Sequence, residues 1–258
     1  EDWFPPRTFR AAVKWLEENR NVDRFFLVVD EFDPHEPWNG PTNLLHMYFD
    51  TAKYDGRRII NTETGPFEFR EGELEYTRAQ YAAEVTLVDE YVGRLLGKVR
   101  ELGLWENTIV ILTSDHGHPI MEHGILHKAS HCLYPELMDC VFVIYHPDKE
   151  FAGTTCGAYV GHQDIPPTAL ALTGVSRPVP LDGRNAWDWV TGKKSDRREH
   201  VTSIFGDWVW CRDEEYAYIS DINGNQTKLY DIREDPQQYN SIAEQKSDIC
   251  QDMFKRIL

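Results

Sequence analysis

One helical stripe constrains the fold of this chain more than any other feature of its sequence. Between residues 74 and 102, apolar side chains recur at three- and four-residue intervals, and the stripe ends at Gly103. Apolar runs of strand length occur at 25–29, 107–112 and 140–145. Their hydrophobicity is continuous rather than alternating, which is typical of strands that are covered on both faces. The pattern predicts an α/β fold, with a mainly parallel sheet sandwiched by helices.

The pattern of apolar and polar residues changes beyond residue 196. Short alternating segments follow, with the turn signal Asn223-Gly224 between two of them and a final apolar-spaced stretch at 242–257. These features predict a small antiparallel sheet closed by a helix. We therefore expect a large α/β domain at 1–196 and a small α+β subdomain at 197–258.

The charge balance excludes several classes of protein. Acidic residues number 43 against 27 lysines and arginines, which gives a formal net charge of −16. Because such a surface repels phosphate backbones and anionic lipid, nucleic acid and membranes are not expected partners. No apolar run approaches the roughly 18 residues of a membrane span.

The five cysteines form no C-x-x-C pair and are odd in number, which favours a reducing, cytoplasmic location.

An aspartate and a histidine stand where one of the predicted strands ends. Asp115-His116-Gly117 lies at the carboxyl end of the run 107–112, which is where open α/β sheets bind their ligands. A carboxylate oxygen beside an imidazole nitrogen can bind a divalent ion, and Gly117 lets the backbone turn away sharply. An aspartate in a turn also commonly bonds its own backbone, so the triplet alone leaves a plain turn open.

A histidine-rich loop continues from this triplet. Five histidines fall within sixteen residues, and Lys128 lies among them; they are His116, His118, His123, His127 and His131. A structural loop has little need for so many imidazoles, so the loop is a candidate for a functional site. A zinc cluster that includes Cys132 is an alternative, although the spacing matches no common zinc-finger pattern.

A further histidine follows the run at 25–29. His35 stands between two prolines in Asp33-Pro34-His35-Glu36-Pro37, which restrict the backbone on both sides. An imidazole held at a strand end suits proton donation to a leaving group or a hydrogen bond to an anionic oxygen. A histidine that merely completes a turn is the alternative interpretation.

Four segments carry motifs that one protein family shares. They are FFLVVDEFDPHEPW at 25–38, the run 81–128 that ends in TSDHGHPIMEHGILHK, residues 162–174, and LYD at 229–231 with the Asp-Pro and Asn that follow it. These motifs resemble those of the sulfatases, within the alkaline phosphatase superfamily. The matches keep the family's order and extend from one end of the chain to the other. The resemblance implies a sulfatase-like α/β fold.

The resemblance also implies roles for four residues. In sulfatases the DHG-type motif binds one divalent metal, which implies Asp115 and His116 as metal ligands, with calcium preferred and magnesium or manganese possible. Lys128 closes the HGxxxK element and is implied to contact the sulfate oxygens. His35 is implied to lie against the transferred group and its leaving oxygen. His35 and Lys128 are therefore the expected catalytic and substrate-binding residues.

Two elements of a working sulfatase do not occur in this sequence. These are the C-x-P-S-R motif, whose cysteine becomes formylglycine, and an Asp-Asp pair that completes the metal site. In the family both precede the DPHxPW motif, so we expect this chain to be the carboxyl-terminal portion of a longer protein. The isolated polypeptide is expected to have little or no turnover, because it lacks a nucleophile. The missing segment, as the same or a separate chain, is an expected partner.

The parent protein is therefore expected to be a metal-dependent hydrolase of a small-molecule or glycan sulfate ester. A phosphonate or phosphate ester hydrolase of the same superfamily is one alternative, and a noncatalytic metal-binding or interaction domain is another. Tryptophans 187, 189, 208 and 210 also suggest a sugar-binding platform, although tryptophans at such spacing more often belong to a core.

Overall fold

The computed structural model describes residues 3–54, 64–176, 179–194 and 196–257 of the chain. Its residues group into two compact units, Glu1–Thr108 and Ile109–Leu258. The domain boundary expected after residue 196 falls inside the second unit and stays a prediction. None of the described helices combines the length and the apolar character that a membrane crossing requires.

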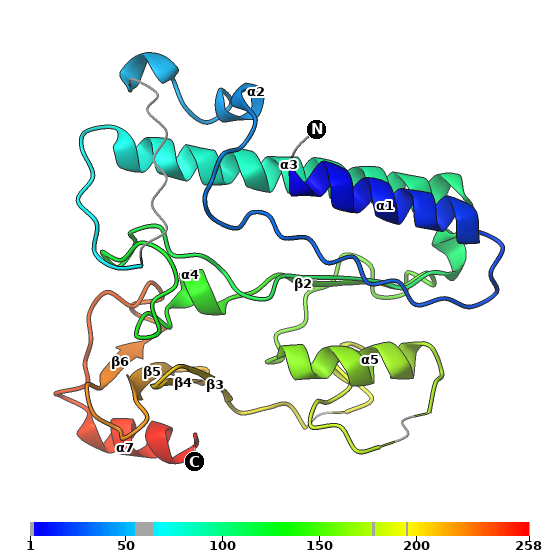
Figure 1. Cartoon of the computed structure of the whole chain (residues 1–258). Helices are drawn as coiled ribbons and strands as arrows, with labels where there is room; N and C mark the ends of the chain where they lie inside the picture. The colour runs from blue at the N-terminus through cyan, green and yellow to red at the C-terminus, as the bar shows by residue number, and fades with distance from the viewer. Residues whose placement is uncertain (1–2, 55–63, 177–178, 195, 258) are drawn as a thin grey trace. The chain divides into compact units, whose positions relative to one another are not determined.

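The first unit is built from helices (Figure 1). Its elements are α1 (Phe4–Asn19), α2 (Thr42–Leu45), α3 (Glu73–Glu101) and two short 3-10 turns, Thr51–Lys53 and Trp105–Asn107. Helices α1 and α3 lie side by side, and α1 buries Phe9, Ala12 and Leu16 at the spacing of one helix face. Lys98 on α3 binds Glu17 on α1 across 2.9 Å. The two helices are therefore joined by an apolar seam and by charge.

Helix α3 confirms the helix that the sequence predicts, but its buried face differs from the predicted apolar stripe. Glycines with positive φ flank it, Gly72 at +80° and Gly103 at +70°, a conformation that costs a glycine little. The most buried part of its face, including Ala83 and Leu87, packs in the first half of the helix. Val85 is 41% exposed, because the buried face at this point is formed by Ala83, Glu84 and Leu87.

The second unit contains both sheets of the described chain. Its strands are β1 (Val110–Thr113), β2 (Phe142–Tyr145), β3 (Val201–Phe205), β4 (Trp208–Arg212), β5 (Tyr216–Asp221) and β6 (Lys228–Asp231). Its helices are α4 (Pro135–Met138), α5 (Ile165–Leu172), α6 (Trp187–Val190) and α7 (Ser247–Lys255), with a 3-10 turn at His162–Asp164. The strands predicted at 107–112 and 140–145 are thus confirmed as β1 and β2.

The pairing of β1 and β2 differs from the parallel arrangement that their composition suggests. The two strands run antiparallel, with Val110 opposite Tyr145 and Thr113 opposite Phe142. The segment 25–29, predicted as a third buried strand, forms no ladder with any described residue. A continuous apolar run does not specify strand direction, and a strand forms only where another backbone satisfies its N–H and C=O groups. The runs are also not covered on both faces within this chain, since Phe26 and Val143 are 82% and 54% exposed.

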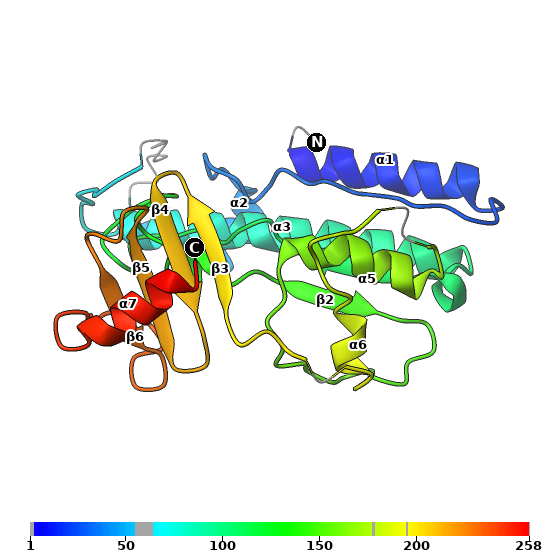
Figure 2. The ribbon, with the colours of Figure 1, turned by 90° about the horizontal axis from the view of Figure 1, so that it is seen from below.

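The small sheet predicted near the carboxyl end is confirmed. Strands β3 to β6 form an antiparallel sheet in sequence order, and α7 lies across one of its faces (Figure 2). On that face Cys211, Tyr218 and Leu229 pack against the helix. The opposite face packs on the segment 129–138, which includes α4. The alternation along each strand therefore places two separate cores on the two faces of one sheet.

Candidate active site

The predicted metal-binding pair lies on the loop that leaves β1. Asp115 is exposed, and its Oδ1 accepts the backbone N–H of His116 across 2.8 Å. Asp115 Oδ2 lies 3.5 Å from His116 Nε2. A carboxylate oxygen and an imidazole nitrogen are therefore adjacent, as binding of a single ion requires. Asp115 also bonds its local backbone, as an aspartate in a turn does. Both interpretations from the sequence, a turn residue and a metal ligand, therefore agree with its position.

The tautomer of His116 follows from the hydrogen bond that its Nδ1 makes. Nδ1 lies 2.7 Å from the carbonyl oxygen of Gly117 and must donate to it, because a carbonyl only accepts. In the neutral imidazole the lone pair then resides on Nε2, the atom next to Asp115. A metal-ligating histidine is commonly held in this way by a backbone carbonyl. These two side chains fit a divalent cation, and they supply two of the several ligands that such an ion takes.

Gly117 fixes this loop against α4. Its N–H donates to the carbonyl of Leu137 across 2.8 Å, and a Cβ at this position would lie 2.1 Å from the carbonyl oxygen of Glu136. No side chain can be accommodated there without moving backbone. His162 donates from Nε2 to the carbonyl of Ser114 across 2.8 Å. The loop is thus held from two directions.

The histidines of the following loop are mostly packed inside the unit. His127 is 1% exposed, and its Nδ1 lies 2.9 Å from His118 Nε2. His123 stacks on Tyr134 with the ring centroids 3.6 Å apart, and its Nε2 lies 3.4 Å from a carboxylate oxygen of Glu136. Burial lowers the pKa of His123 despite that acidic neighbour. The contacts of His123 join the loop to α4 and to the residue before it. Nothing in the sequence spacing indicated these contacts.

Lys128 and Cys132 have different surroundings on this loop. Lys128 is half-buried and follows the buried His127, whose φ is +65°. Cys132 is buried in the apolar cluster beneath the sheet, and burial raises the pKa of its thiol. In the part of the chain that is described, Cys132 joins no group of three potential metal ligands. A zinc cluster with Cys132 is therefore not formed.

His35 belongs to the first unit and is held on both sides. Its ring stacks on Phe32 at a centroid distance of 4.4 Å, and its Nδ1 donates to the carbonyl of Glu36 across 2.8 Å. The peptide bonds before Pro34 and Pro37 are cis. Trp38 is buried and donates from Nε1 to the carbonyl of Pro34 across 3.1 Å, which closes the turn around His35. The imidazole is therefore held in a defined position.

Asp33, two residues before His35, has an unusual carboxyl group. Burial and the negative charge of Glu31 raise the pKa of Asp33 from 3.8 to about 6, which the nearby His35 partly offsets. Burial likewise raises the pKa of Glu31, although Thr8 and backbone N–H groups donate to its carboxylate. The turn that carries His35 is therefore bordered by two acids with raised pKa values, and Asp33 is about half ionised near pH 6.

The structure thus places three of the four predicted residues, Asp115, His116 and Lys128, in the second unit. It brings Asp115 and His116 together, and it places Lys128 on the loop that begins at their strand end. His35 lies in the first unit, in a turn of its own. The convergence of His35 with the other three stays a prediction.

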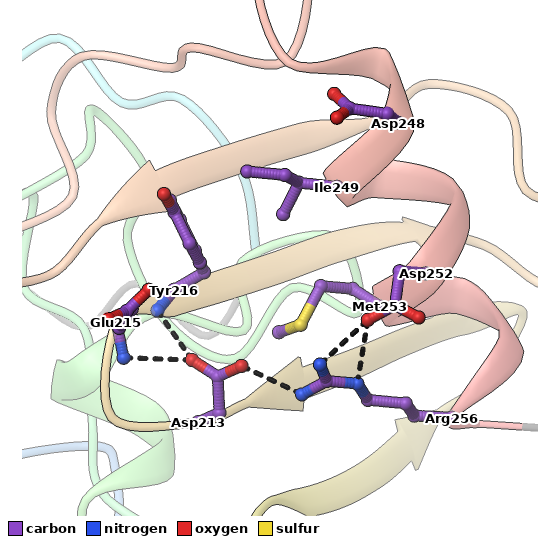
Figure 3. A pocket seen from close by; sticks show the side chains of 8 residues that line it. All are labelled: Asp213, Glu215, Tyr216, Asp248, Ile249, Asp252, Met253 and Arg256. Atoms are coloured by element: carbon purple, nitrogen blue, oxygen red, sulfur yellow. Dashed lines mark hydrogen bonds and ion pairs between the residues drawn. The ribbon is translucent and has the colours of Figure 1, made fainter.

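A cavity of about 310 Å³ lies elsewhere in the second unit, against α7 (Figure 3). It is lined by Asp213, Glu215, Tyr216, Asp248, Ile249, Asp252, Met253 and Arg256. Arg256 binds Asp213 and Asp252, each across 2.7 Å, so its charge is already balanced within the protein. None of the predicted site residues lines this cavity, and its polar contacts tie α7 to the sheet.

Comparison with known proteins decides the family. The family model described as Sulfatase matches residues 6–175, which is more than half of the chain. The chain belongs to the sulfatase family. Its DHG and HGxxxK elements lie inside the matched region, so the resemblance read from the motifs is confirmed.

Named relatives and a solved structure agree with this assignment. The chain is 29% identical over 203 residues to an N-acetylglucosamine-6-O-sulfatase of Bacteroides thetaiotaomicron, covering 68% of this chain and 35% of that protein. It is 26% identical over 299 aligned positions to arylsulfatase K of Bos taurus, covering 99% of the chain and 54% of the relative. The solved structure named as the sulfatase yidJ of Bacteroides fragilis matches with a TM-score of 0.80 and 22% identity.

That structure confirms the fold class. The match covers 99% of this chain, so the chain has the α/β fold of a sulfatase, with the small antiparallel sheet and helix at its carboxyl end. It covers 57% of the solved chain. The chain therefore spans about half the length of the solved structure and of arylsulfatase K.

Proposed function

We propose that the protein to which this chain belongs hydrolyses a sulfate ester with the aid of a divalent metal ion. The observation that carries the proposal is the orientation of His116, whose Nε2 lone pair is held beside the exposed carboxylate of Asp115 in a chain of the sulfatase family. The names of the two relatives support an amino-sugar sulfate or an aryl sulfate as the substrate.

Asp115 and His116 would hold the metal; the family favours calcium, and magnesium and manganese also accept an oxygen-rich site with one imidazole. When bound, the ion would supply positive charge that stabilises negative charge developing on the sulfate group. The bond from His116 Nδ1 to the Gly117 carbonyl keeps the ring in the tautomer that ligation needs. The packing of Gly117 on α4 keeps the whole loop in place.

Lys128 and His35 would act on the ester itself. The Lys128 ammonium would neutralise the non-bridging sulfate oxygens. His35 would hold the leaving oxygen and give it a proton as the S–O bond breaks, so that the alcohol leaves in neutral form. Because Nδ1 of His35 donates to the Glu36 carbonyl, the transferred proton would come from Nε2–H of the imidazolium form, which becomes the neutral ring.

The nucleophile would come from polypeptide outside this chain. The sequence contains no C-x-P-S-R motif, and the family's formylglycine would supply the attacking group. Exposed apolar side chains support the presence of a covering segment: Phe26 and Val28 are 82% and 68% exposed, and in the second unit Val143 of β2 is 54% exposed. That segment is either the remainder of the same protein or a separate partner chain.

The proposal is tested on the full-length protein with its metal. Release of sulfate from N-acetylglucosamine 6-sulfate and from 4-nitrophenyl sulfate is compared with hydrolysis of a 4-nitrophenyl phosphonate monoester. We expect Asp115→Asn and Lys128→Met to lower kcat/KM for the sulfate esters by about 100-fold or more. Asp148→Asn, an exposed acid beside His146, is the matched control and should leave kcat/KM unchanged. Preference for the phosphonate ester, or wild-type rates in Asp115→Asn, would contradict the proposal.

A further inference from the structure

A second group of polar and aromatic residues lies in the same unit as Lys128, on the face of the small sheet that packs on segment 129–138. Trp208 of β4 and Lys228 of β6 are half-buried at the rim of this face, beside the core residue Tyr134. His131 contacts Trp208 with the ring centroids 5.8 Å apart. The residues come from three separate segments that only the fold brings together.

The ammonium group of Lys228 is held in a defined position. Its Nζ donates to the hydroxyl of Tyr134 across 3.0 Å and lies 5.2 Å from the Tyr134 ring centroid and 5.9 Å from that of Trp208. Aromatic faces attract a cation, but they do not neutralise its charge. An ammonium has three donors, and the described contacts use one of them.

Among the described residues, the half-buried cations Lys98, Arg198 and Arg212 each bind at least one carboxylate. Lys228 is half-buried as well, but it has no such partner among these residues. No carboxylate of the described residues lies within ion-pair distance of Lys228 Nζ. In a chain with 43 acidic residues, a held and uncompensated ammonium at a rim is an unusual arrangement. It favours binding of an external anion.

His131 adds a neutral donor to this positive charge. Burial, together with the charge of Lys228, lowers the pKa of His131 below its ordinary value. The imidazole is therefore uncharged at neutral pH and can donate one N–H to an anionic or hydroxyl oxygen. Trp208 offers a half-buried indole on which the apolar face of a sugar ring can pack. Of the other tryptophans considered for a sugar-binding platform, Trp189 and Trp210 are buried and cannot do so.

Chain connectivity limits the distance between this group and Lys128. Three peptide units separate Lys128 from His131, so their Cα atoms lie no more than about 11 Å apart. This reach corresponds to a small number of sugar units. A substrate whose sulfate ester contacts Lys128 could therefore place a second charged group at Lys228.

We propose that Trp208, His131 and Lys228 form a binding subsite for a second anionic group, a carboxylate or a sulfate, on an acidic oligosaccharide substrate. The assignment rests on the proposed sulfatase function for its biological meaning, and it rests on the contacts above for its chemistry. Lys228 pairs with the anion, His131 donates a hydrogen bond, and Trp208 packs against the sugar ring. The subsite makes the protein selective for polyanionic glycans over simple aryl sulfates.

The test measures binding, so that it does not depend on turnover. The full-length protein is titrated with a sulfated, uronate-containing disaccharide, with its desulfated counterpart, with the matching disaccharide that lacks the carboxylate, and with inorganic sulfate. We expect Lys228→Met to weaken binding of the fully charged disaccharide about ten-fold or more, and Lys228→Arg to restore most of it. If Lys228→Met no longer weakens binding of one of the two partly charged disaccharides, the anionic group which that disaccharide lacks is the one that the subsite binds.

Two controls separate the possible failures. Lys255→Met removes one exposed positive charge from α7 of the same unit and should leave the affinity unchanged. Thermal unfolding of each variant shows whether Lys228→Met has altered the fold, and Trp208→Phe provides an independent variant with the same expected loss. Equal disaccharide affinity in wild type, Lys228→Met and Trp208→Phe overturns the subsite. Loss of binding in these variants together with no hydrolysis of any sulfate ester by wild type overturns the proposed function instead.

Discussion

His116 donates a hydrogen bond from Nδ1–H to the carbonyl oxygen of Gly117 across 2.7 Å, and this bond leaves the Nε2 lone pair beside the carboxylate of Asp115. The orientation of the His116 ring is therefore set by the backbone carbonyl of the next residue, Gly117. A local bond of this kind survives changes elsewhere in the site, which makes the pair a sensitive place to test metal binding.

Replacement of His116 is expected to weaken the metal site. His116→Ala should lower calcium affinity by at least about ten-fold in the full-length protein, because it removes a ligand and its orienting bond. His116→Asn keeps an acceptor oxygen and should retain more affinity than the alanine variant. Isothermal titration with calcium measures both. Equal affinities for wild type and His116→Ala would remove His116 from the site.

Gly117→Ala should destabilise the second unit. The added Cβ would lie 2.1 Å from the Glu136 carbonyl oxygen, so backbone must move, at a cost of about 1–3 kcal/mol or more in free energy of unfolding. Gly157→Ala is the control, because a Cβ there meets no atom within 4 Å. Urea unfolding of the two variants should show a loss for the first and little change for the second.

The ion pair of Asp164 with Arg198 is expected to contribute strongly to stability. Asp164 is fully buried and accepts two hydrogen bonds from the Arg198 guanidinium as well as the N–H groups of Gly161 and Arg184. Arg198→Ala should cost about 3–5 kcal/mol, because it leaves a buried charge without its partner. A cost below 1 kcal/mol, measured by denaturant unfolding, would show that water replaces the guanidinium.

The same pair has a defined pH dependence. Burial opposes ionisation of Asp164, but hydrogen bonds from Arg198 and from two backbone N–H groups outweigh it and lower its pKa below 3.8. A carboxyl group whose pKa is lower in the folded state stabilises the fold at pH values above its unfolded-state pKa. This stabilisation is lost as the pH falls through its folded-state pKa. The stability difference between wild type and Asp164→Asn should therefore be full at neutral pH and shrink below about pH 4. A difference that is independent of pH would contradict this assignment.

Asp33 should show the opposite behaviour. Because burial and Glu31 raise its pKa to about 6, the folded state binds this proton more tightly than the unfolded state does. Stability is then lost as pH rises from 3.8 to about 6, so Asp33→Asn should raise Tm at pH 7.5 and change it little near pH 4. Asp23→Asn, at an exposed position of the same unit, is the control. A lower Tm for Asp33→Asn at pH 7.5 would reverse the sign.

Helix α3, two of the apolar strands, the small carboxyl-terminal sheet and the family were all predictable from the sequence. These features are local, because periodicity and turn residues act over a few positions, and the motifs retain their residues and order. Asp115 and His116 are also neighbours in sequence, so their proximity needed no tertiary information. The terminating Gly103 and the Asn223-Gly224 turn are of the same kind, since each depends on the conformation of one glycine.

Tertiary structure decided the rest. The antiparallel direction of β1 and β2, the burial of His127, and the contact of Lys228 with Tyr134 all join residues that are distant in sequence or depend on which surface is covered. Composition reports that a residue prefers to be buried, but it does not specify its neighbours. Packing selects those neighbours, because buried polar groups such as Asp164 must find partners and only the folded chain brings Arg198 within reach.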